Sequence, residues 1–265
     1  MAVGALAGPF AIGRLVAAGV PWETIVAGGA VAAAAVAVVL GTRALPPAHR
    51  VDRHRMGTTL GSESDARSRR RIPVPVLVLS AAIACYVATE MGVTSWLVRY
   101  LDDAPIELAT LALSLFWGGM ALGRLVSSFL AGRMGAVKLA ATWSVACGVA
   151  VIASLVAPTL GLAIACFAVA GFAAGPVYPM IMAIGGSIYP DRSSMVSSVL
   201  ASAAIVGSIV YPPLMGQLSG TVGLGVSMLG AGLFSFVAAG LIVAGARLDP
   251  RRRGVTPAGA SASHG

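Results

Sequence analysis

Three polar side chains recur at intervals of four residues inside one long apolar stretch of the sequence. Tyr86, Glu90 and Thr94 lie between positions 74 and 101, where most of the neighbouring residues are hydrophobic. In a helix this spacing places all three side chains on one face. A carboxyl group flanked by hydroxyl groups can bind a polar solute or take up and release a proton, and we expect such a role here. The alternative is a neutral Glu90 that only hydrogen-bonds to a neighbouring helix.

The stretch from Val74 to Leu101 is long enough to cross a membrane as a helix. At about 1.5 Å of rise per residue, it exceeds the roughly 30 Å thickness of the hydrocarbon core of a bilayer. Glu90 then lies near the middle of the membrane. A charged side chain at that depth costs about 2.5–3.5 kcal/mol on insertion scales. We therefore expect Glu90 to face the interior of a helical bundle or a wet cavity, not lipid.

The composition predicts that the whole chain is a polytopic membrane protein. Of the 265 residues, 57% are hydrophobic and only 11% are charged, and the mean hydropathy is +0.88. Such values lie outside the range of soluble domains. The apolar spans are 1–20, 24–42, 74–101, 106–131, 136–156, 160–188, 194–218 and 222–246. The predicted fold is an all-α membrane protein, a bundle of about eight transmembrane helices in the cell membrane.

Several other functions find no support in the sequence. Cys85, Cys147 and Cys166 all lie inside hydrophobic spans, which argues against disulfides and a metal cluster. No zinc, catalytic-triad or phosphate-loop pattern is present. The net charge of +8 is carried by polar segments without interleaved aromatic residues, so nucleic acid is not an expected partner. We expect neither an enzyme nor a bound cofactor or metal.

The distribution of charge predicts the orientation in the membrane. Basic residues gather in the segment 43–73, in the turn with Arg133 and Lys138, and in the tail 247–265. The turn with Asp102 and Asp103 on the opposite side is acidic. Because cytoplasmic loops carry an excess of Lys and Arg, the segment 43–73 is predicted to be a cytoplasmic linker, and 247–265 a disordered cytoplasmic tail.

An internal repeat suggests that the chain is built from two halves. Residues 4–15 align with residues 207–218 at a constant offset, with glycine, proline, glycine and leucine in common. Parallel halves are a known plan of membrane transporters. On this plan, 74–246 is a six-helix C-terminal half and 1–42 holds the last two helices of an N-terminal half. We expect the other N-terminal helices to lie in the same full-length chain or in a partner.

Twelve helices in two halves around a basic central loop is the plan of the major facilitator superfamily, and the chain resembles helices five to twelve of a member. The motif Tyr86-Val-Ala-Thr-Glu90, followed by Trp96, resembles helix seven of the fucose:proton symporter-like sugar permeases. The segment 116–125 resembles the next helix of the same permeases. The chain departs from the pattern at Ala88, where glycine is usual, and at Gly132, where the superfamily's basic turn has an acid.

The resemblance implies a secondary active transporter that moves a small, sugar-like polar solute by alternating access, coupled to protons. Two alternatives remain. Gly8-Pro9 with Gly13 resembles the helix-five signature of proton-coupled drug antiporters, which would make the chain an exporter. The third hypothesis is a truncated, non-transporting membrane protein, because small-residue faces carry no large hydrophobic penalty in lipid.

Aromatic and basic residues in the later spans are further candidates for the site. Trp117, Tyr178 and Tyr211 are candidates for lining a solute cavity. Arg124 lies about eighteen residues into its span, or roughly 27 Å along a helix. It is a candidate for an inner gate near Glu90, and the alternative is a side chain that reaches to the membrane surface. Arg133 and Lys138 in the basic turn are also assigned to gating.

Glycine and proline mark positions where helices pack closely or bend. Gly119 and Gly123 form a ridge of small residues that allows close helix approach. Gly175 and Pro176 are predicted to break the sixth span, and Pro212 with Pro213 the seventh, because proline removes helical hydrogen bonds. These breaks are expected to act as hinges or to line the cavity.

Overall fold

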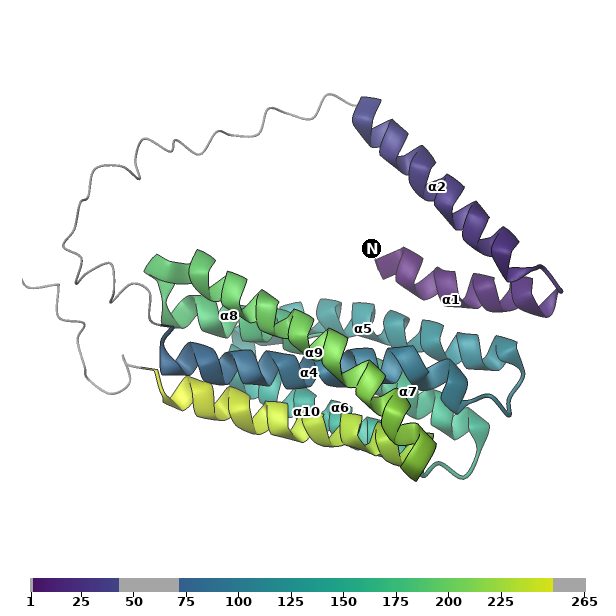
Figure 1. Ribbon diagram of the computed structural model, residues 1–265. Coiled ribbons are helices and arrows are strands. Elements are labelled where there is room, and N and C mark those ends of the chain that lie inside the picture. Colours follow the sequence, from purple (N-terminus) through teal and green to yellow (C-terminus); the bar gives the residue numbers. More distant parts are fainter. Residues whose placement is uncertain (1, 43–71, 250–265) are drawn as a thin grey trace, which may run out of the picture. The chain divides into compact units, whose positions relative to one another are not determined.

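The computed structural model describes residues 2–42 and 72–249, and within these ranges the regular structure is helical. The helices (Figure 1) are α1 (Ala2–Ala17), α2 (Trp22–Thr42), α4 (Val74–Tyr100), α5 (Ile106–Met134), α6 (Ala136–Leu155), α7 (Leu160–Ala174), α8 (Val177–Ile188), the short 3₁₀ helix η2 (Pro190–Arg192), α9 (Ser193–Val222) and α10 (Leu224–Arg247). The all-α fold class is confirmed. The predicted linker 43–73 and tail 247–265 lie almost entirely outside the described residues.

Seven helical segments of the described residues are long and apolar enough to cross a membrane, against the eight predicted. They are α2, α4, α5, α6, α7 with α8, η2 with α9, and α10. Helix α1 has 16 residues, which at the helical rise spans about 24 Å, less than the hydrocarbon core. Helices α4 to α10 belong to one compact unit and α2 to another, so the two are described separately.

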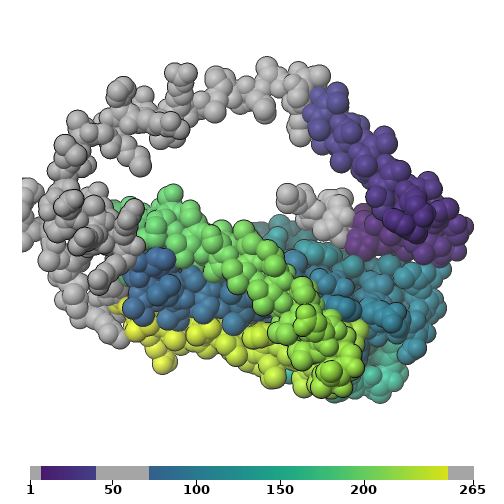
Figure 2. All heavy atoms as spheres, in the orientation of Figure 1, coloured from purple at the N-terminus to yellow at the C-terminus, as the bar shows by residue number. Residues whose placement is uncertain are grey.

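Helix α4 is the central element of the α4–α10 unit. It has its most extensive contacts with α9 and α10, and further contacts with α5 and α8. On the face seen in Figure 2, α4 is visible between α9 and α10, which cover it from two sides. The most apolar window of α4 is 61% buried, whereas the windows of the other spans in this unit are 22–50% buried. A polar side chain on α4 is therefore directed mainly at protein.

Glycine allows α5 and α7 to approach each other closely. A Cβ atom added at Gly123 would collide with the carbonyl oxygen of Phe172, and one at Gly171 with that of Phe116. Gly119 and Gly175 face the backbone of the opposite helix in the same way. Glycine at these positions lets the two backbones lie in direct contact. The predicted ridge of small residues on α5 is matched by glycines of α7.

The sixth span is divided into two helices, whereas the seventh is continuous. Helix α7 ends at Ala174 and α8 begins at Val177, with Gly175 and Pro176 between them. Helix α9, by contrast, runs through Pro212 and Pro213, so the predicted break there is wrong. At the break between α7 and α8, Gly175 directly precedes Pro176, and Pro179 follows in the first turn of α8, so a glycine and two prolines lie within five residues.

Candidate functional site

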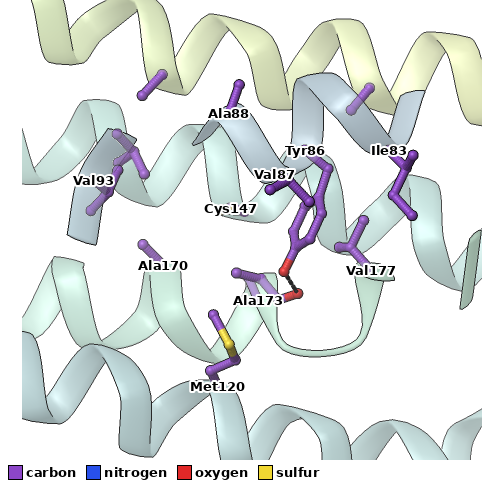
Figure 3. Packing of buried hydrophobic residues seen from close by; sticks show 14 of the residues in the cluster. Ile83, Tyr86, Val87, Ala88, Val93, Met120, Cys147, Ala170, Ala173 and Val177 are labelled. Atoms are coloured by element: carbon purple, nitrogen blue, oxygen red, sulfur yellow. Dashed lines mark hydrogen bonds between the residues drawn. The ribbon is translucent and has the colours of Figure 1, made fainter. Parts of the chain in front are cut away.

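The side chains of Tyr86 and Thr94 form hydrogen bonds in different parts of the bundle. Tyr86 is buried, and its hydroxyl donates to the carbonyl of Ala174, at the end of α7, over 2.8 Å. In Figure 3 the ring points away from α4 toward the turn that follows α7. The Thr94 hydroxyl donates to the backbone carbonyl of Glu90 over 2.9 Å, within its own helix. The predicted polar stripe therefore exists along α4, but its outer members bond to the backbone.

Glu90 is only 8% exposed and lines a cavity between α4, α5, α8 and α9. The cavity has a volume of about 580 Å³, within the usual range for small-molecule sites. Its lining residues are Val87, Glu90, Met91, Arg124, Tyr178, Pro179, Ala201, Ala204, Ile205 and Ser208. Most of the wall is apolar, and the polar groups are one carboxyl, one guanidinium and two hydroxyls. An apolar cavity with a few convergent polar groups is typical of a ligand site.

The carboxyl group of Glu90 and the guanidinium of Arg124 face this cavity without a direct ion pair. The two groups interact electrostatically. The ion pair found among the described residues is a different one, between Arg99 and Asp102 at the surface, at 3.4 Å. Glu90 and Arg124 are therefore close enough to influence each other. Neither group is held by direct contact with the other.

Arg124 is instead hydrogen-bonded at the break between α7 and α8. Its Nε donates to the carbonyl of Gly175 over 3.1 Å, and its Nη2 lies 3.3 Å from the sulfur of Met120. The carbonyl of residue 175 would normally accept from the N–H of residue 179, which is a proline and has none. The Arg124 side chain thus supplies a donor that the backbone lacks.

Two of the predicted cavity residues lie elsewhere. Tyr211 is buried, donates from its hydroxyl to the Ser227 carbonyl over 2.8 Å, and packs edge-on against Phe234. Trp117 is half-buried and packs edge-on against Phe116, with ring centroids 6.3 Å apart. Neither lines the cavity, whereas Tyr178 does. Aromatic type alone did not distinguish these positions.

The remaining predicted residues lie at the ends and contacts of helices. Arg133 and Lys138 are exposed on either side of the turn at Gly135, and neither lines the cavity. Gly119 and Gly123 lie in the contact with α7. Gly175 and Pro176 lie between α7 and α8, and Pro212 lies inside α9. Among the described residues, no group of three potential metal-ligating side chains lies together.

Two polar residues near the site were missed by sequence reasoning. Thr89 is buried, and its hydroxyl donates to the Ala231 carbonyl over 2.7 Å and accepts from the Ser235 hydroxyl over 3.3 Å. Ser208 lines the cavity from α9. Thr89 lies beside Glu90 in an apolar helix, and that isolated hydroxyl was the available signal. Ser208 is one of many serines in α9 and carried none.

The fold and the site define a multi-pass helical membrane protein in which the buried Glu90 and the exposed Arg124 line a ligand-sized cavity. Residues 103–264 match the family model described as Major Facilitator Superfamily, and the chain belongs to that family.

Among solved structures, the chain is similar to the crystal structure of the E. coli fucose:proton symporter FucP. The TM-score is 0.63 and the sequence identity is 20%, over 79% of this chain and 52% of the symporter. The chain therefore spans about half the length of that relative, and the similarity concerns the fold. Comparison with curated protein sequences gave no match.

Proposed function

We propose that the chain is part of a secondary active transporter that moves a small, sugar-like polar solute together with protons by alternating access. The observation that carries this proposal is the cavity that Glu90 and Arg124 share without a direct ion pair. An intramembrane carboxyl group of this kind is expensive and marks a pathway for solutes or protons in many membrane proteins.

Membership of the superfamily and the fold of the fucose:proton symporter support this function. We propose that 74–246 forms one six-helix half and that 1–42 holds two helices of the other. Solute sites of such transporters lie near the middle of the membrane between the two halves. The cavity beside Glu90 would then be the share of the site that this half contributes.

The cavity residues have distinct proposed roles. The Glu90 carboxyl group would take up and release the proton. The hydroxyls of Tyr178 and Ser208 and the Nη1 group of Arg124 would form hydrogen bonds to the hydroxyls of a solute. The apolar side chains around them would pack against the carbon skeleton and keep competing water out.

Transport by the Glu90→Gln variant tests this function. Uptake of radiolabelled fucose and a panel of other monosaccharides would be measured in vesicles from cells that express the chain from its native gene, with and without an imposed proton gradient. Glutamine keeps the size of the side chain but cannot release a proton. Glu90→Gln is therefore expected to lose gradient-driven accumulation and to retain exchange of labelled for unlabelled solute.

Glu107→Gln is the matched control, because Glu107 lies in the first turn of α5 and does not line the cavity. It is expected to transport like the unmodified chain. Gradient-driven accumulation that survives in Glu90→Gln would exclude Glu90 as the proton site. Absence of uptake for every sugar in the unmodified chain would contradict the proposed solute class.

A further inference from the structure

Two consecutive carbonyl groups at the end of α7 are bonded by side chains from other helices. The Ala174 carbonyl accepts from the Tyr86 hydroxyl of α4 over 2.8 Å, and the Gly175 carbonyl accepts from Nε of Arg124 of α5 over 3.1 Å. Figure 3 shows the first of these bonds beside the turn between α7 and α8. The break is thus held by α4 and α5 together.

Both carbonyls are open to side chains because the backbone does not use them. Backbone bonds around the break run from the N–H of Gly175 to Gly171 and from the N–H of Met180 to Pro176. Pro179 cannot donate to Gly175. A buried carbonyl without a donor is costly, so these side-chain bonds contribute to the observed geometry of the break.

Arg124 has a second acceptor available across the cavity. Its guanidinium and the Glu90 carboxyl group line the same cavity and interact electrostatically. The bond from arginine to the Gly175 carbonyl has a charge on the donor alone, whereas a bond to a carboxylate has a charge on both partners and adds their mutual attraction. The neutral form of Glu90 offers no such advantage over the Gly175 carbonyl. The charge of Glu90 therefore decides which acceptor Arg124 prefers.

We propose that Arg124 is a positioning residue that links the charge of Glu90 to the geometry of the break between α7 and α8. With Glu90 neutral, Arg124 holds the Gly175 carbonyl through the hydrogen bond seen in this structure. With Glu90 charged, Arg124 turns toward the carboxylate, the Gly175 carbonyl loses its donor, and α8 is free to tilt on α7. The inference rests on the proposed role of Glu90 as the proton-binding group.

Among the ionisable groups near Glu90, Arg124 is the cation that can respond to the charge of the carboxyl group. Tyr86 is on the same helix, Cys147 faces Glu90 from α6, and Tyr178 lines the cavity from α8. Helix α9 contributes Tyr211, which is bonded to Ser227. The charged residue of α10 is Arg247, in its last turn. Arg124 is the cationic side chain that lines the cavity.

Hydrogen exchange at the break tests the proposal without any transport measurement. Exchange would be followed by mass spectrometry for a peptide covering the amides of Val177, Tyr178 and Met180, as protection factors corrected for the intrinsic effect of pH. In the unmodified chain, protection is expected to fall about fivefold between acidic and alkaline pH, the equivalent of one hydrogen bond. In Glu90→Gln, protection should stay high throughout.

Changes at Arg124 separate its bond to Gly175 from its charge. Arg124→Leu removes the donor, so protection is expected to be low at every pH. Adding Pro179→Ala returns a backbone N–H to the Gly175 carbonyl, so the double variant should regain protection without pH dependence. Arg247→Gln, at an exposed arginine in the last turn of α10, is the control and should behave like the unmodified chain.

Each outcome distinguishes this inference from the proposed function. Protection that is independent of pH in the unmodified chain, or that still falls with pH in Glu90→Gln, would overturn the link between Glu90 and the break. Failure of Pro179→Ala to restore protection in the Arg124→Leu background would show that the Gly175 bond is not what holds the break. If transport of sugars is absent but the exchange pattern appears, the proposed function fails and the link stands.

Discussion

At the scale of single residues, the hydroxyl groups of α4 show that one side-chain type serves different purposes within two turns. The Thr89 hydroxyl joins α4 to α10 through the Ala231 carbonyl, whereas the Thr94 hydroxyl bonds to a carbonyl of its own helix. In lipid, packing and hydrogen bonds between helices are main sources of association, because apolar side chains gain little from leaving an apolar solvent. Only the Thr89 bond adds to the contact between two helices.

Replacement of Thr89 by valine is expected to destabilise the bundle more than the same replacement at Thr94. Thr89→Val removes the bond to Ala231 and the partner of the Ser235 hydroxyl. Hydrogen bonds between membrane helices contribute about 0.6 kcal/mol on average and at most about 1.7 kcal/mol, so a loss in this range is expected. Denaturant unfolding in detergent micelles measures it. Equal losses for the two variants would contradict the interhelical role of Thr89.

At the scale of elements, the contact between α5 and α7 depends on the absence of side chains. Gly119 and Gly123 on α5, Gly171 on α7 and Gly175 directly after α7 each face the backbone of the opposite segment. Backbone atoms cannot move aside as a flexible side chain can. The distance between these two helices is therefore set by glycine, and Arg124 reaches the Gly175 carbonyl from within this contact.

Gly123→Ala is expected to separate α5 from α7 and to lower stability. The added Cβ would collide with the Phe172 carbonyl oxygen, and overpacking of this kind costs about 1–3 kcal/mol. The control is Gly132→Ala in the same helix, where a Cβ meets no atom within 4 Å. Alanine there should be neutral or stabilise by up to about 1 kcal/mol through helix propensity. Thermal unfolding of the two variants in detergent compares them, and equal midpoints would show that the contact adapts to a methyl group.

The helices could be predicted well from hydropathy, and their breaks could not. The span predicted at 74–101 is observed as Val74–Tyr100, because its length and apolar content are properties of the local sequence. Helix α9 continues through Pro212, and the Pro212 carbonyl also accepts from Nε1 of Trp96 in α4 over 2.9 Å, a contact that the local sequence does not reveal. Proline removes a donor from a helix, but whether the helix ends there depends on such tertiary contacts.

The same distinction applies to the site. The sequence predicts Glu90 and Arg124 as site residues because charges are rare in apolar spans, and Tyr178 because its hydroxyl could bind a polar solute. The structure places all three at one cavity. Their grouping depends on contacts between α4, α5 and α8, which periodicity does not reveal. Tyr211 has the same chemistry as Tyr178 but is bonded to Ser227.

At the scale of the whole molecule, the crossings from α4 to α10 sort the connections onto two sides of the membrane. The turns after α5 and after α8 lie on one side, together with the end of α10. Arg133, Lys138, Arg192 and Arg247 lie near these ends. The opposite side carries the loop 101–105 with its two aspartates. Because Lys and Arg are enriched in cytoplasmic loops, we propose that the first side is cytoplasmic.

Cysteine labelling in intact cells is expected to show this orientation. Asp103→Cys and Gly132→Cys place an exposed thiol on opposite sides, because residue 103 precedes α5 and residue 132 lies in its last turn. A maleimide that does not cross membranes should label Asp103→Cys directly, and Gly132→Cys only after the cells are permeabilised. The unmodified chain, with cysteines that are buried or half-buried, gives the background. The reverse pattern would place the basic ends outside the cell. Arg124 lies nearer to these ends than Glu90 does. A gate at the break between α7 and α8 would then open away from the cytoplasm. Labelling of both positions in intact cells would mean that α5 does not cross the membrane at all, which no transporter of the proposed kind could accommodate.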